Sequence, residues 1–149
     1  MRESQLMQSD TQDAPRMLAG QCLCGAVRYA VPDEFRYAYN CHCGNCRRAT
    51  GSAFKPFAGI ERVKLRVTQG EDGLLIFGDG DRDDAAHDAH CKVCGSLLYS
   101  VVRAGEFVHI TLGTLGDAPS VRPSAHLFVG SMATWFTITD ALPQHDEFP

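Results

Sequence analysis

Seven cysteines stand in three short groups of the 149-residue chain. The groups are Cys22-Leu23-Cys24-Gly25, Cys41-His42-Cys43-Gly44-Asn45-Cys46 and Cys91-Lys92-Val93-Cys94-Gly95. Residues i and i+2 of a strand point to the same face, so C-x-C presents two sulfur atoms to one metal ion. C-x-x-C is a turn whose two thiolates reach one ion, and a glycine after it tolerates a positive φ. The pattern therefore predicts that the cysteines are metal ligands.

The groups differ in how many sulfur atoms they bring together. Structural zinc takes four tetrahedral ligands, whereas three protein ligands and a free fourth position are typical of catalytic zinc. The middle group supplies three sulfur atoms from one short segment. We therefore expect one open site, with His42 pointing away from it, on Cys41, Cys43 and Cys46. The other groups then share a closed site that joins distant parts of the chain, on Cys22, Cys24, Cys91 and Cys94.

Other uses of these cysteines fit the pattern less well. A redox pair is typical of a lone C-x-x-C rather than of three groups. Paired two-cysteine groups in a β-rich chain favour zinc over an iron–sulfur cluster, so we expect two Zn²⁺ ions per chain. The spacing leaves open an inert three-cysteine site that a histidine from elsewhere closes. Candidates for that histidine are His42, His90 and His126.

Composition narrows the class of protein. The length fits one domain with a real core, and the net charge of −4 argues against a partner that is nucleic acid or an anionic membrane. No apolar run approaches the roughly 20 residues that span a bilayer.

The polar start of the chain, residues 1–17, lacks a secretory h-region and is predicted to be a flexible leader, with 18–149 as a single domain. A cytoplasmic location is expected, where clustered cysteines bind metals more often than they form disulfides.

Short alternating runs between glycine-rich turns predict a mainly β fold with short helical turns only. Val63, Leu65 and Val67 alternate with polar residues and indicate a strand with one buried face. Further strands are predicted at 26–31, 36–40, 54–60, 74–77, 97–103, 108–112 and 134–138. The stretch 45–50 is predicted to form one helical turn that ends at Gly51. The acidic stretch 79–88 lacks the register of a calcium loop and is predicted to be a solvated hairpin tip.

The order of the motifs resembles a known family. The sequence has C-x-C-G-x-V-x-Y from Cys22, C-H-C-x-x-C-R-x-x-x-G from Cys41 and C-x-x-C-G-S-x-L from Cys91. These motifs, with G-T-L-G-D at 113–117 and R-P…H-L-F-V-G-S at 122–131, resemble the glutathione-dependent formaldehyde-activating enzyme (GFA, or CENP-V domain) family. The resemblance covers Leu18 to Pro149, with His90 standing where the family often has an aromatic residue.

The resemblance implies a fold, two zinc ions and an activity. It implies the β-tent (Mss-four-like) fold, a structural zinc on the four-cysteine set and a second, catalytic zinc on the three-cysteine set. It implies a carbon–sulfur lyase of the S-hydroxymethylglutathione synthase type, which acts on the adduct of glutathione, or another small-molecule thiol, with formaldehyde. The second zinc is expected to be lost easily, because an open three-thiolate site is exposed to oxidation and exchange. The alternative is a non-catalytic, zinc-stabilised binding or thiol-carrier module on the same fold.

Few other residues suggest a role in such chemistry. An open zinc site holds a thiol as thiolate, which can add to the carbonyl carbon of a small aldehyde. Arg47 and Arg48 follow the last cysteine of the middle group and are candidates for binding the carboxylates of glutathione. His126 is a candidate acid or base, although a structural hydrogen bond is the more common role of such a histidine. Trp135 is predicted to lie in the core. No feature of the sequence indicates an oligomeric state.

Overall fold

The computed structural model describes residues 14–78 and 82–149 of the chain. The mainly β class is confirmed, since the only helices in this part of the chain are short. The strands, the α-helix and the 3-10 helices (η) follow in chain order: β1 (Met17–Gln21), β2 (Arg28–Pro32), β3 (Tyr37–Cys41), α2 (Gly44–Thr50), β4 (Lys55–Glu61), η1 (Arg62–Lys64), β5 (Arg66–Gln69), η2 (Glu71–Gly73), β6 (Leu74–Gly78), β7 (His87–Cys91), β8 (Leu97–Val102), η3 (Arg103–Gly105), β9 (Phe107–Thr111), η4 (Leu112–Thr114), β10 (His126–Leu127) and η5 (Val129–Ser131).

The strands form two sheets with the main core between them. One sheet has the order β1-β2-β5, and the other has the order β10-β3-β4-β9-β8-β7-β6. The core joins Leu18 and Tyr29 of the smaller sheet to Ile60, Val108 and Ile110 of the larger one. Each such fully buried side chain contributes roughly 1.5–3 kcal/mol. This packing fixes one face of the larger sheet and leaves its other face for a site.

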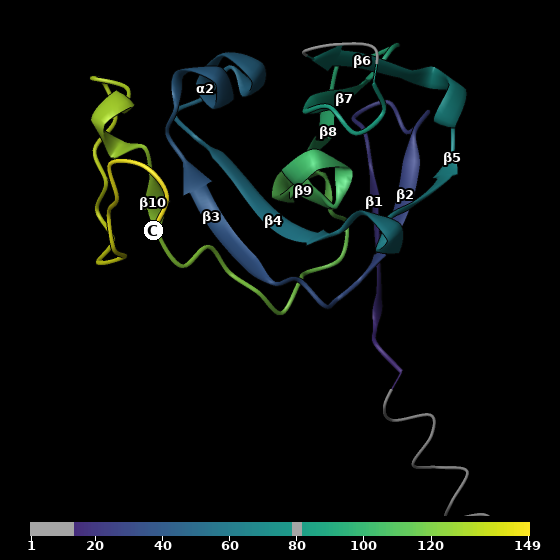
Figure 1. The fold of residues 1–149 in the computed structure, drawn as a ribbon, viewed down its shortest axis with the longest axis horizontal. Helices are drawn as coiled ribbons and strands as arrows, with labels where there is room; N and C mark the ends of the chain where they lie inside the picture. The colour runs from purple at the N-terminus through teal and green to yellow at the C-terminus, as the bar shows by residue number, and fades with distance from the viewer. Residues whose placement is uncertain (1–13, 79–81) are drawn as a thin grey trace, which may run out of the picture.

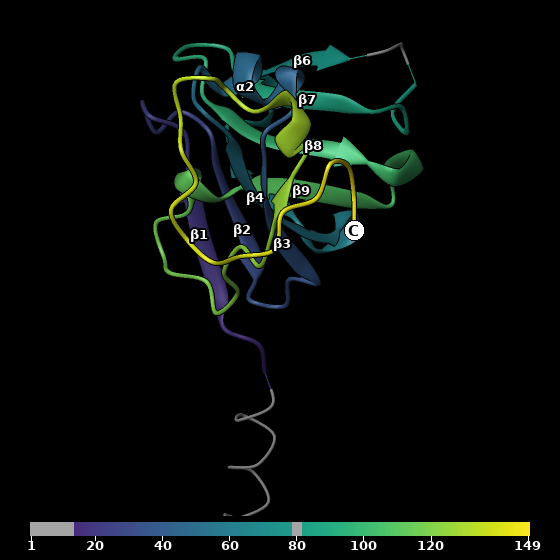
Figure 2. The ribbon, with the colours of Figure 1, turned by 90° about the vertical axis from the view of Figure 1, so that its left-hand side faces the viewer.

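The larger sheet bends strongly, as Figure 1 shows. The helix α2 lies above the side of the bend that contains β3 and β4, and the strands β6 and β7 form the opposite side. Side chains alternate along each strand, and those facing away from the core line the inside of the bend. Tyr37 lies opposite Gly59 there, and a Cβ atom at Gly59 would meet the Tyr37 ring at 2.2 Å. Figure 2 shows the C-terminal segment, in yellow, on the β10 and β3 side of this sheet.

Several predicted elements are confirmed and others are wrong. The predicted turn at 45–50 is the helix α2, which ends at Gly51 with φ 62°. Residues 134–138 form no strand, and Trp135, predicted to lie in the core, is 71% exposed because no strand there supplies a buried face. The strand predicted from the alternating residues Val63, Leu65 and Val67 starts too early. Val63 lies in the helix η1 and is 91% exposed, and β5 starts only at Arg66. The strands β1, β7 and β10 were not predicted, because their sequences lack a strong alternating pattern.

The start of the chain is partly within the described residues. Residues 1–13 of the predicted leader lie outside them, whereas Met17 opens β1 and Arg16 bonds Asp33 at 3.0 Å. Of the acidic stretch, Asp79 and Asp81 also lie outside them. The α-helix of the described part is far too short to cross a membrane, and no membrane-spanning helix is found there.

Candidate metal sites

In the structure, two of the three cysteine motifs come together as a four-cysteine group, which joins the end of β1 to the end of β7. The Sγ atoms of Cys22, Cys24, Cys91 and Cys94 all lie within 4.8 Å of one another. The Cys22–Cys24 distance is 3.7 Å and the Cys24–Cys91 distance is 3.8 Å. Four sulfur atoms at about 2.3 Å from one tetrahedral ion would be about 3.8 Å apart. The spacing therefore fits one thiolate-preferring metal ion with no position left open.

Backbone and side-chain groups around this set donate hydrogen bonds to several of its sulfur atoms. The backbone N–H of Val27 donates to Cys22 Sγ at 3.3 Å, and the N–H of Cys94 donates to Cys91 Sγ at 3.5 Å. The Ser96 hydroxyl lies 3.2 Å from Cys94 Sγ and, with the Ser96 backbone N–H, lowers the pKa of that thiol to about 5. The turn ends at Gly95, whose φ of 81° disfavours any other residue.

The second group lies at the junction of β3 and α2. The Sγ atoms of Cys41, Cys43 and Cys46 lie within 4.8 Å of one another. Cys43 is the N-cap of α2, and its Sγ accepts the N–H of Cys46 at 3.3 Å. The neighbouring thiols of Cys41 and Cys46, together with backbone N–H groups, lower the pKa of Cys43 far below its ordinary value. The group supplies three ligands for a metal ion from one segment, in the four-plus-three partition that the spacing predicts.

A buried lysine stands beside the second group. Lys55 is paired with Cys41 across the β3–β4 ladder, so both side chains project from the same face of the sheet. Its residue is only 5% exposed, and its Nζ donates to Ser100 Oγ at 2.7 Å. The Ser100 hydroxyl donates in turn to Asp88 Oδ1 at 2.5 Å. Burial lowers the pKa of Lys55, while the charges of Cys46 and Asp88 oppose that shift. The chain of bonds holds the ammonium group in place.

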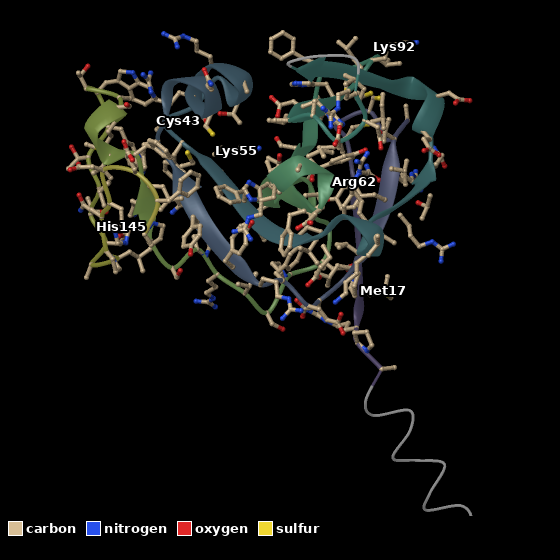
Figure 3. All side chains as sticks on the ribbon, viewed as in Figure 1. Met17, Cys43, Lys55, Arg62, Lys92 and His145 are labelled. Carbon is tan, nitrogen blue, oxygen red and sulfur yellow. The ribbon has the colours of Figure 1, made fainter. Side chains whose placement is uncertain are left out.

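A cavity of about 690 Å³ opens between α2 and strands β6 to β8. It is lined by Cys46 and Arg48 from α2 and by Asp88 and Ser100 from the facing strands. Figure 3 shows Cys43 beside the start of α2 and Lys55 projecting from β4 into the space between α2 and β8. The volume lies in the usual range of small-molecule sites. The three-cysteine group therefore reaches, through Cys46, a space that a ligand can enter. Lys55 does not line this space itself, but its hydrogen-bond partner Ser100 does, and the charges of the three cysteines act on its ammonium group.

The other predicted site residues lie in different places. Arg48 lines the cavity, whereas Arg47 is used to hold α2 against η5, because its Nε donates to the carbonyl of Ser131 at 3.2 Å. His126 is 2% exposed and lies 2.8 Å from His42 through Nδ1 and 2.9 Å from Asp140 through Nε2. His42 thus points away from the second cysteine group, as its position in the strand predicts. Neither histidine lines the cavity.

Comparison with known proteins identifies the family. Residues 17–131, most of the chain, match the sequence model of the family described as "Glutathione-dependent formaldehyde-activating enzyme". The chain belongs to the GFA family. The match begins at the first residue of β1 and includes both cysteine groups and Lys55. It confirms the resemblance found in the three cysteine motifs.

Two proteins similar to this GFA chain, one compared by sequence and one by structure, are each 28% identical to it. A protein of Halomonas elongata, named "Putative glutathione-dependent formaldehyde-activating enzyme", is 28% identical over 127 residues, which are 82% of this chain and 81% of that protein. The crystal structure of a Rhodobacter sphaeroides protein, a structural genomics target, superposes with a TM-score of 0.55 at 28% identity. That match covers 68% of this chain and 91% of the other.

The Lys55–Ser100–Asp88 chain of hydrogen bonds in this GFA protein was not predicted from the sequence. One signal was available for Lys55, since it is the single charged residue between Ser52 and Ile60 in an otherwise apolar strand. Asp88 was assigned to a solvated hairpin tip, but it lies in β7 and accepts the hydrogen bond of a buried serine. The partnership of these residues depends on the register of β7 and β8, which no local pattern in the sequence reveals.

Proposed function

We propose that this protein is a zinc-dependent carbon–sulfur lyase of the S-hydroxymethylglutathione synthase type. It would join glutathione, or another small thiol, to formaldehyde and cleave the same adduct. The observation that carries the proposal is the three-cysteine group on the edge of a cavity of about 690 Å³, next to the buried ammonium of Lys55. Family membership supports the choice of thiol and aldehyde.

The donor atoms support zinc in both sites. Four clustered thiolates are a structural ligand set for Zn²⁺, and three leave a position for an exogenous ligand. Cys22, Cys24, Cys91 and Cys94 would hold the structural ion, and Cys41, Cys43 and Cys46 would hold the second one. When bound in the second site, Zn²⁺ would supply Lewis acidity that keeps the substrate sulfur as thiolate.

The residues of the chain account for the remaining chemistry. The substrate sulfur forms a bond to the aldehyde carbon, and the C=O electron pair moves to the oxygen, which finally carries the proton that left the thiol. Lys55 would donate a hydrogen bond to this oxygen, and its bond to Ser100, which lines the cavity, supports this role. A donor preorganised in a site with little water stabilises charge as it develops. Reversal of the same steps releases the aldehyde.

Other groups have smaller roles in this proposal. Arg48, on the cavity wall, would attract a substrate carboxylate, whereas Arg47 is occupied by its bond to Ser131. His126 would act at a distance, by supporting the turn after Cys41 through its contact with His42. The cytoplasmic location and the single domain over residues 18–149 remain part of the proposal.

The test is to measure metal content and the reaction on the same preparation. We expect two Zn²⁺ per chain by elemental analysis, and adduct formation from glutathione and formaldehyde faster than the spontaneous reaction in matched buffer. Cys43→Ser should bind one ion and lose the acceleration. The matched control is Ser52→Ala, an exposed hydroxyl just after α2 that does not line the cavity.

The outcomes separate this enzyme from the binding module predicted as the alternative. Saturable thiol binding to a two-zinc protein without any rate acceleration would replace the lyase with a thiol-carrier module. A Cys43→Ser variant that keeps two ions would contradict the assignment of the second site.

A further inference from the structure

A second cavity lies further along the inner face of the bent sheet. Its volume is about 510 Å³, and it shares Val102 with the cavity beside Cys46. Its described lining residues include the rings of Tyr37, Tyr39, His109 and Phe148, with Arg103 at the end of β8. None of these lining side chains is acidic, and the backbone end of the described chain, at Pro149, also borders the cavity. The two cavities form neighbouring parts of one face.

Arg103 is held over this cavity by aromatic stacking. Its guanidinium carbon lies 5.0 Å from the centre of the Tyr37 ring and 4.8 Å from that of Phe107. No carboxylate of residues 14–78 or 82–149 lies within 4.0 Å of it. Arg103 and Ala104 both adopt left-handed conformations, with φ of 52° and 53°, which cost non-glycine residues about 1–2 kcal/mol each. A strained turn thus presents a guanidinium group that has no acidic partner in the described structure.

The surroundings of Arg103 favour an anion. His109 stacks on Phe57 at 4.1 Å, and its Nε2 lies 2.7 Å from the Tyr37 hydroxyl. Burial first, and then the positive charges of Lys55 and Arg103, lower the pKa of His109 to about 3. The imidazole is therefore neutral near pH 7 and does not add a second cation. Arg103 is therefore the one charged side chain among those that line this cavity, and aromatic rings surround its planar set of N–H donors.

The distance to the three-cysteine group suits a short peptide. Tyr37, Tyr39 and Cys41 lie on one face of β3, and the four-residue separation of the first and last is about 13 Å. Tyr37, Tyr39 and Phe57 pack in the same apolar cluster as the three cysteines. An extended tripeptide spans about 10 Å, and a thiol on its central residue reaches a terminal carboxylate along one arm of that length. The long side chain of Arg103 and the side chains of the cysteines supply the rest.

We propose that Arg103, stacked on Tyr37 and Phe107, is a carboxylate subsite for the peptide thiol whose sulfur reaches the three-cysteine group. The proposal rests on the proposed function, because it takes that thiol as the ligand. It adds a second anchoring point, so that the ligand lies along β3 with its sulfur at Cys41, Cys43 and Cys46 and a terminal carboxylate at Arg103. A thiol without a carboxylate gains nothing from this subsite.

The test measures binding of S-methylglutathione, which keeps both carboxylates but has no free thiol. The probe is titrated into the zinc-loaded protein by calorimetry, and ring-proton shifts of Tyr37 and His109 are followed by NMR. Arg103→Met, which keeps the apolar stem, is expected to weaken binding about tenfold or more, since a bond between charged groups is lost. Arg103→Lys should lose less, because it keeps the charge but not the planar fork. Arg66→Met, on the exposed strand β5 of the smaller sheet, is the control and should bind as the wild type does.

The results of this test do not depend on turnover. Binding that requires Arg103 in a protein without lyase activity would keep the subsite and reject the enzyme. Adduct formation by the wild type, with equal binding of the probe to Arg103→Met, Arg103→Lys and Arg66→Met, would overturn the subsite. Failure of the wild type to bind the probe would overturn it as well. If Arg103→Met fails to fold, the comparison of Arg103→Lys with Arg66→Met decides.

Discussion

The four-cysteine group and the three-cysteine group bring the same side chain together in two different ways. In the four-cysteine group, Cys24 and Cys91 are 67 positions apart in sequence but their sulfur atoms are 3.8 Å apart, so one ion would close a long loop. In the three-cysteine group, the sulfur atoms come from six consecutive residues, the last of which, Cys46, borders a cavity. Closing a long loop restricts the unfolded chain far more than closing a short one. A metal ion in the first group would therefore serve stability, and one in the second group would stay available for chemistry.

The largest effect is expected from breaking the four-cysteine group. Cys91→Ser removes a buried ligand at the end of β7, and metal-binding free energy in such sites is folding free energy. We expect the variant to lose both the structural zinc and the cooperative unfolding transition. Elemental analysis and circular dichroism melting check this. A variant that melts within a few degrees of the wild type would show that the sheets hold together without this ion.

Breaking the three-cysteine group should have a large effect on activity and a small one on stability. Cys43→Ser still offers an oxygen as the N-cap of α2, so the helix should form. We expect zinc content to fall from two ions to one, the melting temperature to change by less than about 5 °C, and lyase activity to fall below detection. Equal losses of stability in Cys43→Ser and Cys91→Ser would remove the difference between the two groups.

Lys55 tests whether the second group depends on a nearby positive charge. Lys55→Met keeps the volume and removes the charge, and we expect turnover to fall about 100-fold, the effect of losing one preorganised donor. Zinc content should stay at two ions in excess zinc, whereas the melting temperature should fall, because Ser100 and Asp88 lose the positive charge at the end of their hydrogen-bond chain. Steady-state kinetics with glutathione and formaldehyde measure the effect. Unchanged turnover would exclude Lys55 from the reaction.

The same contrast explains what the sequence could predict. Metal-ligand spacing is local, so the four-plus-three grouping of the sulfur atoms was readable from three short motifs. The helix α2 was predicted because its ending glycine, Gly51, lies next to the run that it stops. Lys55 and Asp88 were missed because their meaning depends on strand register, which places Lys55 opposite Cys41 and Asp88 opposite Ser100.

Arg103 and Trp135 are two further residues whose surroundings could not be predicted from the sequence, because they depend on tertiary packing. Arg103 acquires its position from a left-handed turn of its own backbone, from the nearby ring of Phe107, and from the ring of Tyr37 on β3, which is distant in sequence. Trp135 is an apolar residue whose burial was expected from its type alone, but the segment after η5 runs over the surface. Local chemistry is predictable from the chain, whereas the partners that modify it come from the packing of the sheets.

The smallest effect is expected at a site remote from both cysteine groups, which sets the baseline for the comparison. Glu61, at the end of β4, lies 2.6 Å from Arg36 Nε and 3.3 Å from Lys64 Nζ. The hydrogen bond from Arg36 is the main reason that the pKa of Glu61 is lowered from 4.5 to about 2. Arg36 is 63% exposed, so solvent screening limits the cost of Glu61→Gln to about 1 kcal/mol or less.

The pH dependence of this variant gives the sign of the effect. Glu61 is ionised more readily in the folded state, so its stabilisation is complete above pH about 4.5 and is lost as the pH falls toward 2. The difference in unfolding free energy between the wild type and Glu61→Gln should therefore be constant from pH 8 to 5 and shrink below that. Urea unfolding at each pH measures it, with zinc content and lyase activity unchanged at pH 7. A difference that grows on acidification would mean that Glu61 is protonated more easily in the folded chain than in the unfolded one, and that its two ion pairs do not stabilise β4.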